Sequence, residues 1–66
     1  MTTMETILQT LRAYGIEILS VNGNQIKLGH NYEVEVESNG MFKLIDDGYI
    51  VAPFDDPDEL CQFILT

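Results

Sequence analysis

The strongest constraint on the fold lies in residues 32–45, where apolar and polar side chains alternate along the chain. Tyr32, Val34 and Val36 alternate with glutamates, and residues 38–40 read Ser-Asn-Gly, a turn signal. A period of two places successive side chains on opposite faces of a strand. The pattern therefore predicts a β-hairpin with one apolar, buried face and one acidic, outer face.

Core matching predicts the length of the turn in this hairpin. A two-residue loop would place Val36 opposite Lys43 and mix the two faces, which is unfavourable wherever one face is buried. A three-residue Ser-Asn-Gly loop with Gly40 in the left-handed conformation instead pairs Val36 with Phe42 and Glu35 with Lys43. We therefore expect the three-residue loop.

The N-terminal segment predicts an amphipathic helix of about three turns. Thr2 and Glu5 have the spacing of a capping box, and Gly15 is a stop signal. The apolar residues at helical spacing are Met4, Ile7, Leu8, Leu11 and Tyr14.

Residues 16–28 predict a first hairpin, because two segments rich in β-branched and apolar residues flank an Asn-Gly-Asn turn signal. A three-residue loop would pair Ile18 with Leu28. A four-residue loop would pair Val21 with Ile26. The sequence leaves both registers open.

Residues 49–54 predict a last strand, and Pro53 marks it as an edge or an end because proline cannot donate to a ladder. A three-residue Asp-Asp-Gly loop at residues 46–48 would send Ile50 and Ala52 inward. The side chains left outward, a small apolar patch, would be Tyr49, Val51 and Pro53.

The C-terminal segment predicts a short helix. Asp56 is the expected N-cap, Pro57 occupies the first helical position and Glu59 reaches back to the cap. The expected apolar stripe is Leu60, Phe63 and Ile64.

The order is thus a helix, four or five antiparallel strands joined by tight turns, and a helix, within one domain that spans residues 1–66. Short loops make neighbouring strands pair, which predicts an α+β fold with a meander sheet and both helices on one face. A small SH3-like or OB-like barrel with flanking helices is the alternative.

Charge and cysteine content restrict the function. Eleven acidic residues against three basic ones give a net charge of −8. Such a chain repels phosphate backbones and anionic membranes, so we expect no direct nucleic-acid binding and no membrane binding. The lone Cys61 excludes an internal disulfide, and no signal-peptide or transmembrane pattern is present. These features predict a cytoplasmic protein.

The residues that usually act as nucleophiles or bases form no constellation. Cys61 lies near the apolar stripe of the last helix, where a buried thiol behaves as a small hydrophobe. His30 lies in a polar turn, and no pattern places it near Cys61. We therefore expect no enzymatic activity.

Two acidic runs, at residues 46–48 and 55–59, contain the carboxylates that hard cations prefer. Neither run has the spacing of a calcium-binding loop, and a hairpin turn and a helix cap explain them. No glycine-rich phosphate loop occurs. We therefore expect no metal and no cofactor.

The remaining candidate is the outer face of the sheet, on which the glutamates of the alternating segment form a regular line. An ordinary solvated face is the simplest explanation. The functional hypothesis is a docking face for a basic protein partner, and the apolar patch beside it would also suit a homodimer. The candidate partner-binding residues are Glu33, Glu35, Glu37, Asp46, Asp47, Tyr49 and Val51.

The sequence thus predicts a small acidic, non-catalytic protein-interaction or regulatory module. One alternative is a nucleic-acid mimic that inhibits a basic nucleic-acid-binding protein, because a row of carboxylates imitates a row of phosphates. The other is a minor enzymatic or metal-binding role.

Overall fold

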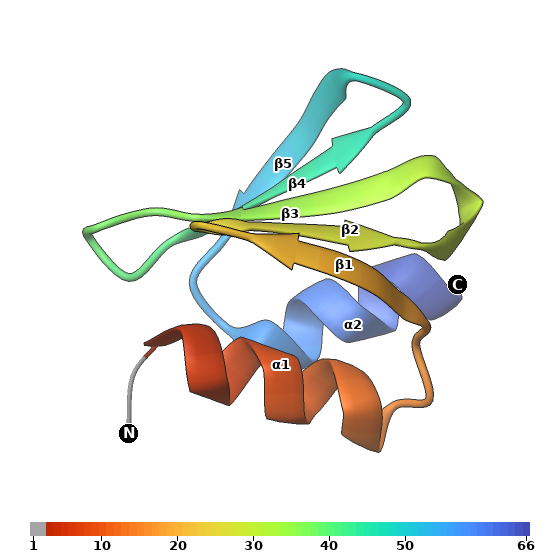
Figure 1. Ribbon diagram of the computed structural model, residues 1–66, viewed down its shortest axis with the longest axis horizontal. Helices are drawn as coiled ribbons and strands as arrows, with labels where there is room; N and C mark the ends of the chain where they lie inside the picture. The colour runs from red at the N-terminus through yellow and green to blue at the C-terminus, as the bar shows by residue number, and fades with distance from the viewer. Residues whose placement is uncertain (1–2) are drawn as a thin grey trace.

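The computed structural model describes residues 3–66 (Figure 1). Within this range, helices α1 (Thr3–Ala13) and α2 (Pro57–Leu65) flank one open antiparallel sheet in the order β1-β2-β3-β4-β5. Its strands are β1 (Ile18–Asn22), β2 (Gln25–Leu28), β3 (Tyr32–Val36), β4 (Phe42–Asp46) and β5 (Tyr49–Phe54). Both helices lie on the same face of the sheet, which confirms the predicted α+β meander rather than a barrel (Figure 1).

Helix α1 packs its apolar stripe against the sheet as predicted. Ile7 and Leu11 are fully buried, and the other apolar residues of the stripe are partly buried against them. The helix stops before Gly15, whose φ of 75° no longer allows a right-handed turn. Thr2, half of the predicted capping box, lies outside the described residues.

Helix α2 begins with the predicted cap. The Oδ1 atom of Asp56 accepts a hydrogen bond of 3.0 Å from the backbone N–H of Asp58, and Pro57 occupies the first turn. Leu60 and Cys61 face inward and are fully buried. Phe63 is 44% exposed, because it lies at the margin of the sheet against the ring of Phe54, with ring centroids 5.7 Å apart.

The core lies between the helices and the three central strands. Burying each of its larger side chains contributes about 1.5–3 kcal/mol. Its buried members are Ile7, Leu11, Ile26, Leu28, Val34, Val36, Phe42, Leu44, Leu60 and Cys61. Strands β1 and β5 supply only partly buried side chains, such as Ile18 and Phe54. The two edge strands are therefore held less by burial than the central ones.

The β3–β4 hairpin has the predicted register. Val36 pairs with Phe42 and Glu35 with Lys43, and the N–H of Glu37 closes the loop by donating to the carbonyl of Met41 at 2.9 Å. Gly40 has a φ of 85°. The prediction of a three-residue loop with a left-handed glycine is confirmed.

The predicted loop of the β4–β5 hairpin is wrong. The turn contains two residues, Asp47 and Gly48, with φ values of 52° and 84°. A type I′ turn requires positive φ at both central positions, and Asp-Gly is among the dipeptides that favour it. The register beside the turn therefore pairs Asp46 with Tyr49 and Ile45 with Ile50.

A β-bulge then shifts the register of β5. Val51 is the additional residue, so that Ala52 pairs with Leu44 and Phe54 pairs with Phe42. The prediction that Ile50 points inward is therefore wrong, and its side chain is 64% exposed. Ala52 does face inward, as predicted, and it lies opposite the buried Leu44.

The first hairpin combines the two registers that the sequence left open. Beside the turn, Val21 pairs with Ile26, whereas farther along the strand Ile18 pairs with Leu28. The additional residue between them is Leu19. Both edge strands thus contain a bulge, while the β2–β3 and β3–β4 pairings show no register shift.

Candidate functional site

The face of the sheet opposite the helices, called here the open face, has a charged centre. Lys27 pairs with Glu33 across β2 and β3, and Glu35 pairs with Lys43 across β3 and β4. The alternation of buried and less buried residues along β3 and β4 fixes this placement, because every second side chain enters the core. Two of the three basic residues of the chain therefore lie among the glutamates of this face.

The glutamates of the open face are partly neutralised. The Nζ atom of Lys43 lies 3.7 Å from Oε2 of Glu35 and 4.0 Å from Oε1 of Glu37. The side-chain amide of Gln25 donates to Oε1 of Glu35 at 3.2 Å. Partly exposed pairs of this kind contribute about 0–1 kcal/mol each to stability. Because the lysines offset these glutamates, the open face carries only a small part of the net charge of −8.

Three predicted members of the docking face lie elsewhere. Asp46 pairs with Tyr32 and Tyr49, and it follows the buried Leu44 by two residues, so this row belongs to the helix side of the sheet. Asp46 and Tyr49 are nevertheless exposed there, because they lie at the end of their strands. Asp47 lies in the turn between them. Asp46 therefore does not share a face with the glutamates, although both were expected to belong to one docking face.

An apolar strip borders the charged centre on the open face. Ile45 and Ile50 are a direct cross-strand pair, Val51 is the bulged residue beside Ile50, and Pro53 pairs with Lys43. Ile50 is 64% and Val51 40% exposed. We call Ile45, Ile50, Val51 and Pro53 the β4–β5 strip. Sequence reasoning found Val51 and Pro53 but missed Ile50, although the Asp-Gly dipeptide at the turn was the signal for the two-residue loop that exposes it.

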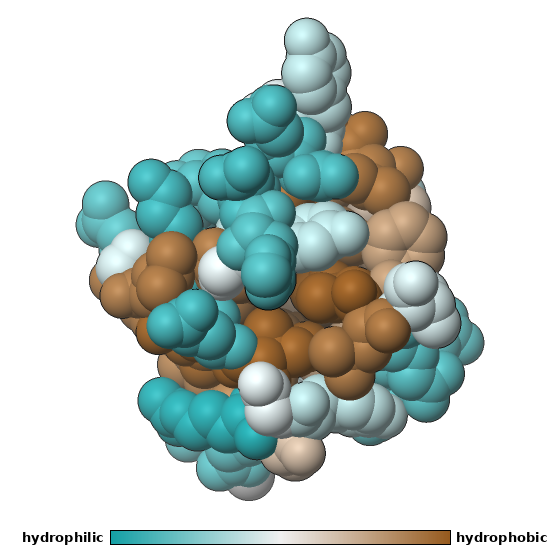
Figure 2. Space-filling view, turned by 90° about the vertical axis from the view of Figure 1, so that its right-hand side faces the viewer, coloured by the Kyte–Doolittle hydropathy of each residue, from teal (hydrophilic) through white to brown (hydrophobic). Residues whose placement is uncertain are grey.

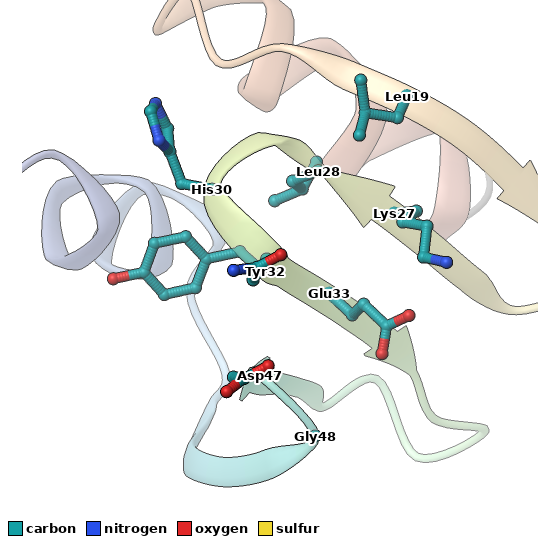
Figure 3. A pocket seen from close by; sticks show the side chains of 9 residues that line it. Leu19, Lys27, Leu28, His30, Tyr32, Glu33, Asp47 and Gly48 are labelled. Atoms are coloured by element: carbon teal, nitrogen blue, oxygen red, sulfur yellow. The ribbon is translucent and has the colours of Figure 1, made fainter.

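A depression of about 430 Å³ lies at one end of the sheet, between the β2–β3 and β4–β5 connections (Figure 3). His30 and Asn31, in the 3₁₀ turn Gly29–Asn31, have φ values of 60° and 67°. The carbonyl of Asn31 accepts a hydrogen bond of 3.0 Å from the N–H of Asp47, which joins the two connections. Figure 3 shows the ring of Tyr32 directed away from Lys27 and Glu33. At this end of the sheet, side chains of the open face and of the helix side therefore both line the depression.

The one cysteine is not placed for nucleophilic chemistry. Cys61 is fully buried beneath the sheet. Burial, together with the negative charge of Asp58, raises the pKa of its thiol from 9.0 to about 11. The thiol is therefore neutral at physiological pH and shielded from solvent. His30 is exposed, as expected for a turn residue.

Among residues 3–66, no group of three or more His, Cys, Asp or Glu side chains is positioned to hold a metal ion. None of the helices in this range has the length and apolar character needed to cross a membrane. No protein-family model matches the chain, and no curated protein or solved structure matches it either. Its function must therefore be inferred from the surface described above.

Proposed function

We propose that the protein is a non-catalytic protein-binding module that contacts its partner through the open face, with the β4–β5 strip at the centre of the contact. The observation that carries this proposal is the exposure of Ile50, Val51 and Pro53 next to the half-buried Ile45. Single exposed apolar residues are ordinary, but a connected apolar patch with a polar border resembles the anatomy of protein interfaces. Ile50 and Val51 are the side chains that a partner would bury first.

The charge of the chain favours a basic partner. The strip lies between the charged centre of the open face and the acidic residues at the two ends of β5, Asp47 and Asp55. A net charge of −8 attracts positively charged proteins over distances of about 8–10 Å at physiological ionic strength. Electrostatics would therefore steer the encounter, and the strip would supply contact area.

A nucleic-acid mimic is supported less well than a binding module of this kind. Such a mimic needs a row of carboxylates free to imitate phosphates. Here Lys43 lies within 4.0 Å of two of the three glutamates, and Lys27 is directly opposite the third, Glu33. The row is thus partly neutralised within its own sheet.

The edges of the sheet are less suited to binding than its open face. A partner strand that adds to an edge needs a regular row of free N–H and C=O groups. The bulge at Leu19 interrupts that row on β1, and the bulge at Val51 and the missing N–H of Pro53 interrupt it on β5. Contact through side chains of the open face avoids this problem.

The proposal is tested by affinity capture from a lysate of the source organism, with the folded protein as bait and elution along a salt gradient. Ile50→Asp should reduce the captured partner to about a tenth, since a buried charge in an interface costs more than about 1.4 kcal/mol. Leu65→Asp is the matched control, because Leu65 is 57% exposed but lies at the carboxyl end of α2, on the helix side of the sheet. Equal capture by both variants would refute the proposal.

Sedimentation equilibrium of the same proteins separates a foreign partner from a second copy of the chain. We expect the unmodified protein to be monomeric, because two copies that each carry a charge of −8 repel one another. A dimer that Ile50→Asp dissociates would keep the strip as the contact but would replace the basic partner with a second copy.

A further inference from the structure

We infer that a second site, distinct from the open face, binds a small organic cation with an apolar body, and that Glu17 is its counter-charge. The site is a cleft of about 370 Å³ on the helix side of the molecule. It lies between the α1–β1 connection, the 3₁₀ turn Gly29–Asn31 and the carboxyl end of α2. Sites for small molecules usually have volumes of about 300–1,000 Å³, and this cleft is at the lower end of that range.

The walls of the cleft are largely apolar. Ile16 comes from the α1–β1 connection, Ile64 and Leu65 come from the last turn of α2, and the ring of Tyr32 closes a further side. Figure 2 looks onto this end of the molecule and shows apolar side chains gathered in a hollow that hydrophilic side chains border. An apolar ligand body would therefore replace water along most of its surface.

The charged side chains that line the cleft determine which sign of ligand charge it favours. Among the described residues, Glu17 is the only acidic one that lines it; no lysine or arginine lines it, and His30 is the one lining residue that can carry a positive charge. A Cβ atom at Gly29 would lie 3.1 Å from Oε1 of Glu17, so the carboxylate rests directly against the backbone of the 3₁₀ turn. The absence of a side chain at Gly29 thus lets the carboxylate occupy the rim.

Two further features favour a cation. The carboxyl end of α2 borders the cleft, and this end carries the negative pole of the helix dipole. The face of an aromatic ring such as that of Tyr32 also attracts cations. These contributions act in the same direction as the carboxylate of Glu17, so an amine should bind more tightly than a neutral or anionic molecule of the same shape.

Titration of the full chain followed by amide ¹H–¹⁵N correlation spectra tests this inference. The probes are cyclohexylammonium, cyclohexanol and cyclohexanecarboxylate, which share one apolar body. We expect cyclohexylammonium to shift the amides of Glu17, Gly29 and Leu65 in a saturable manner. Its affinity should exceed that of cyclohexanol about fivefold, which corresponds to one partly exposed ion pair, and the carboxylate should not bind.

Variants then test the role of Glu17. Glu17→Gln should lower the affinity for cyclohexylammonium to that of cyclohexanol. Glu59→Gln changes the net charge equally at an exposed position outside the cleft, so it should leave the affinity unchanged. Equal affinities of amine and alcohol for the unmodified protein, or equal losses in the two variants, would overturn the inference. Tighter binding of a tetralysine peptide at the same amides would overturn the assignment of a free small cation in favour of a lysine side chain of a protein.

Discussion

The β3–β4 and β4–β5 hairpins share strand β4 and have similar turn sequences, yet their loops differ in length. Both turns contain a dipeptide that favours a two-residue loop, Asn39-Gly40 in the first and Asp47-Gly48 in the second. The β3–β4 hairpin nevertheless forms a three-residue loop. The β4–β5 hairpin forms the two-residue loop and contains a bulge farther along β5. The difference shows where burial sets the register and where turn chemistry does.

Burial explains the contrast. Every second side chain of β3 and β4 enters the core, so a slip of one residue would expose several of them at once, at about 1.5–3 kcal/mol each. On β5 no side chain is fully buried, and only Ala52 and Phe54 are partly so. The preferred turn therefore sets the register at the start of β5. The bulge at Val51 then returns Ala52 and Phe54 to the core side.

Single-residue deletions should show the largest difference in stability between the central strand β4 and the edge strand β5. Deletion of Val51 leaves Ile50 opposite Ile45 and Ala52 opposite Leu44, so the stability should change by less than about 1 kcal/mol. Deletion of Lys43 from β4 has no bulge to absorb it and moves one part of the strand to the wrong face. Since a domain of this size is stable by only about 3–5 kcal/mol, that variant should be unfolded.

Far-UV circular dichroism and urea unfolding of both deletion variants provide the measurement. Loss of the folded state in the Val51 deletion as well as in the Lys43 deletion would contradict the claim that Val51 is an inserted residue which the ladder does not need.

Side-chain truncations compare the central and the edge strand directly. Leu44→Ala should destabilise the protein by about 2–5 kcal/mol, because this side chain is fully buried and its removal leaves a cavity. Ile50→Ala should change the stability by about 0.5 kcal/mol or less, because the side chain is mostly exposed. Urea denaturation midpoints measure both effects, and similar losses would show that β5 buries Ile50 in solution.

Substitution of the turn glycines should have a smaller effect on stability. Gly40 and Gly48 have φ values of 85° and 84°, and an added Cβ meets no neighbour within 4 Å at either position. Alanine at each position should therefore cost about 1–2 kcal/mol through backbone conformation alone. Hydrogen exchange of the flanking strands distinguishes the two variants. Gly48→Ala should loosen β5 selectively, whereas Gly40→Ala should not alter the register of β3 and β4.

The features that sequence reasoning predicted correctly are those that local chemistry or burial determines. The left-handed Gly15, the Asp56 cap and the β3–β4 register all depend on residues close together in the chain. The exposure of Ile50 was missed although the Asp47-Gly48 turn is local, because core pairing was expected to set the register on an edge strand that buries no side chain fully. The cleft at Glu17 was missed for a different reason, since Glu17 and Leu65 are distant in sequence and only the packing of α2 brings them together.

The smallest expected effect concerns Lys43, which belongs to both hairpins because it pairs with Glu35 on one side and Pro53 on the other. Lys43→Gln removes an ammonium group that lies 3.7 Å from Glu35 and 4.0 Å from Glu37. Because these groups are partly exposed, the free energy of unfolding should fall by about 0.5 kcal/mol or less, and added salt should reduce the difference. A double-mutant cycle with Glu35→Gln measures the coupling by urea unfolding. A coupling well above 1 kcal/mol would show that the ion pair, rather than core matching alone, helps to hold the β3–β4 register.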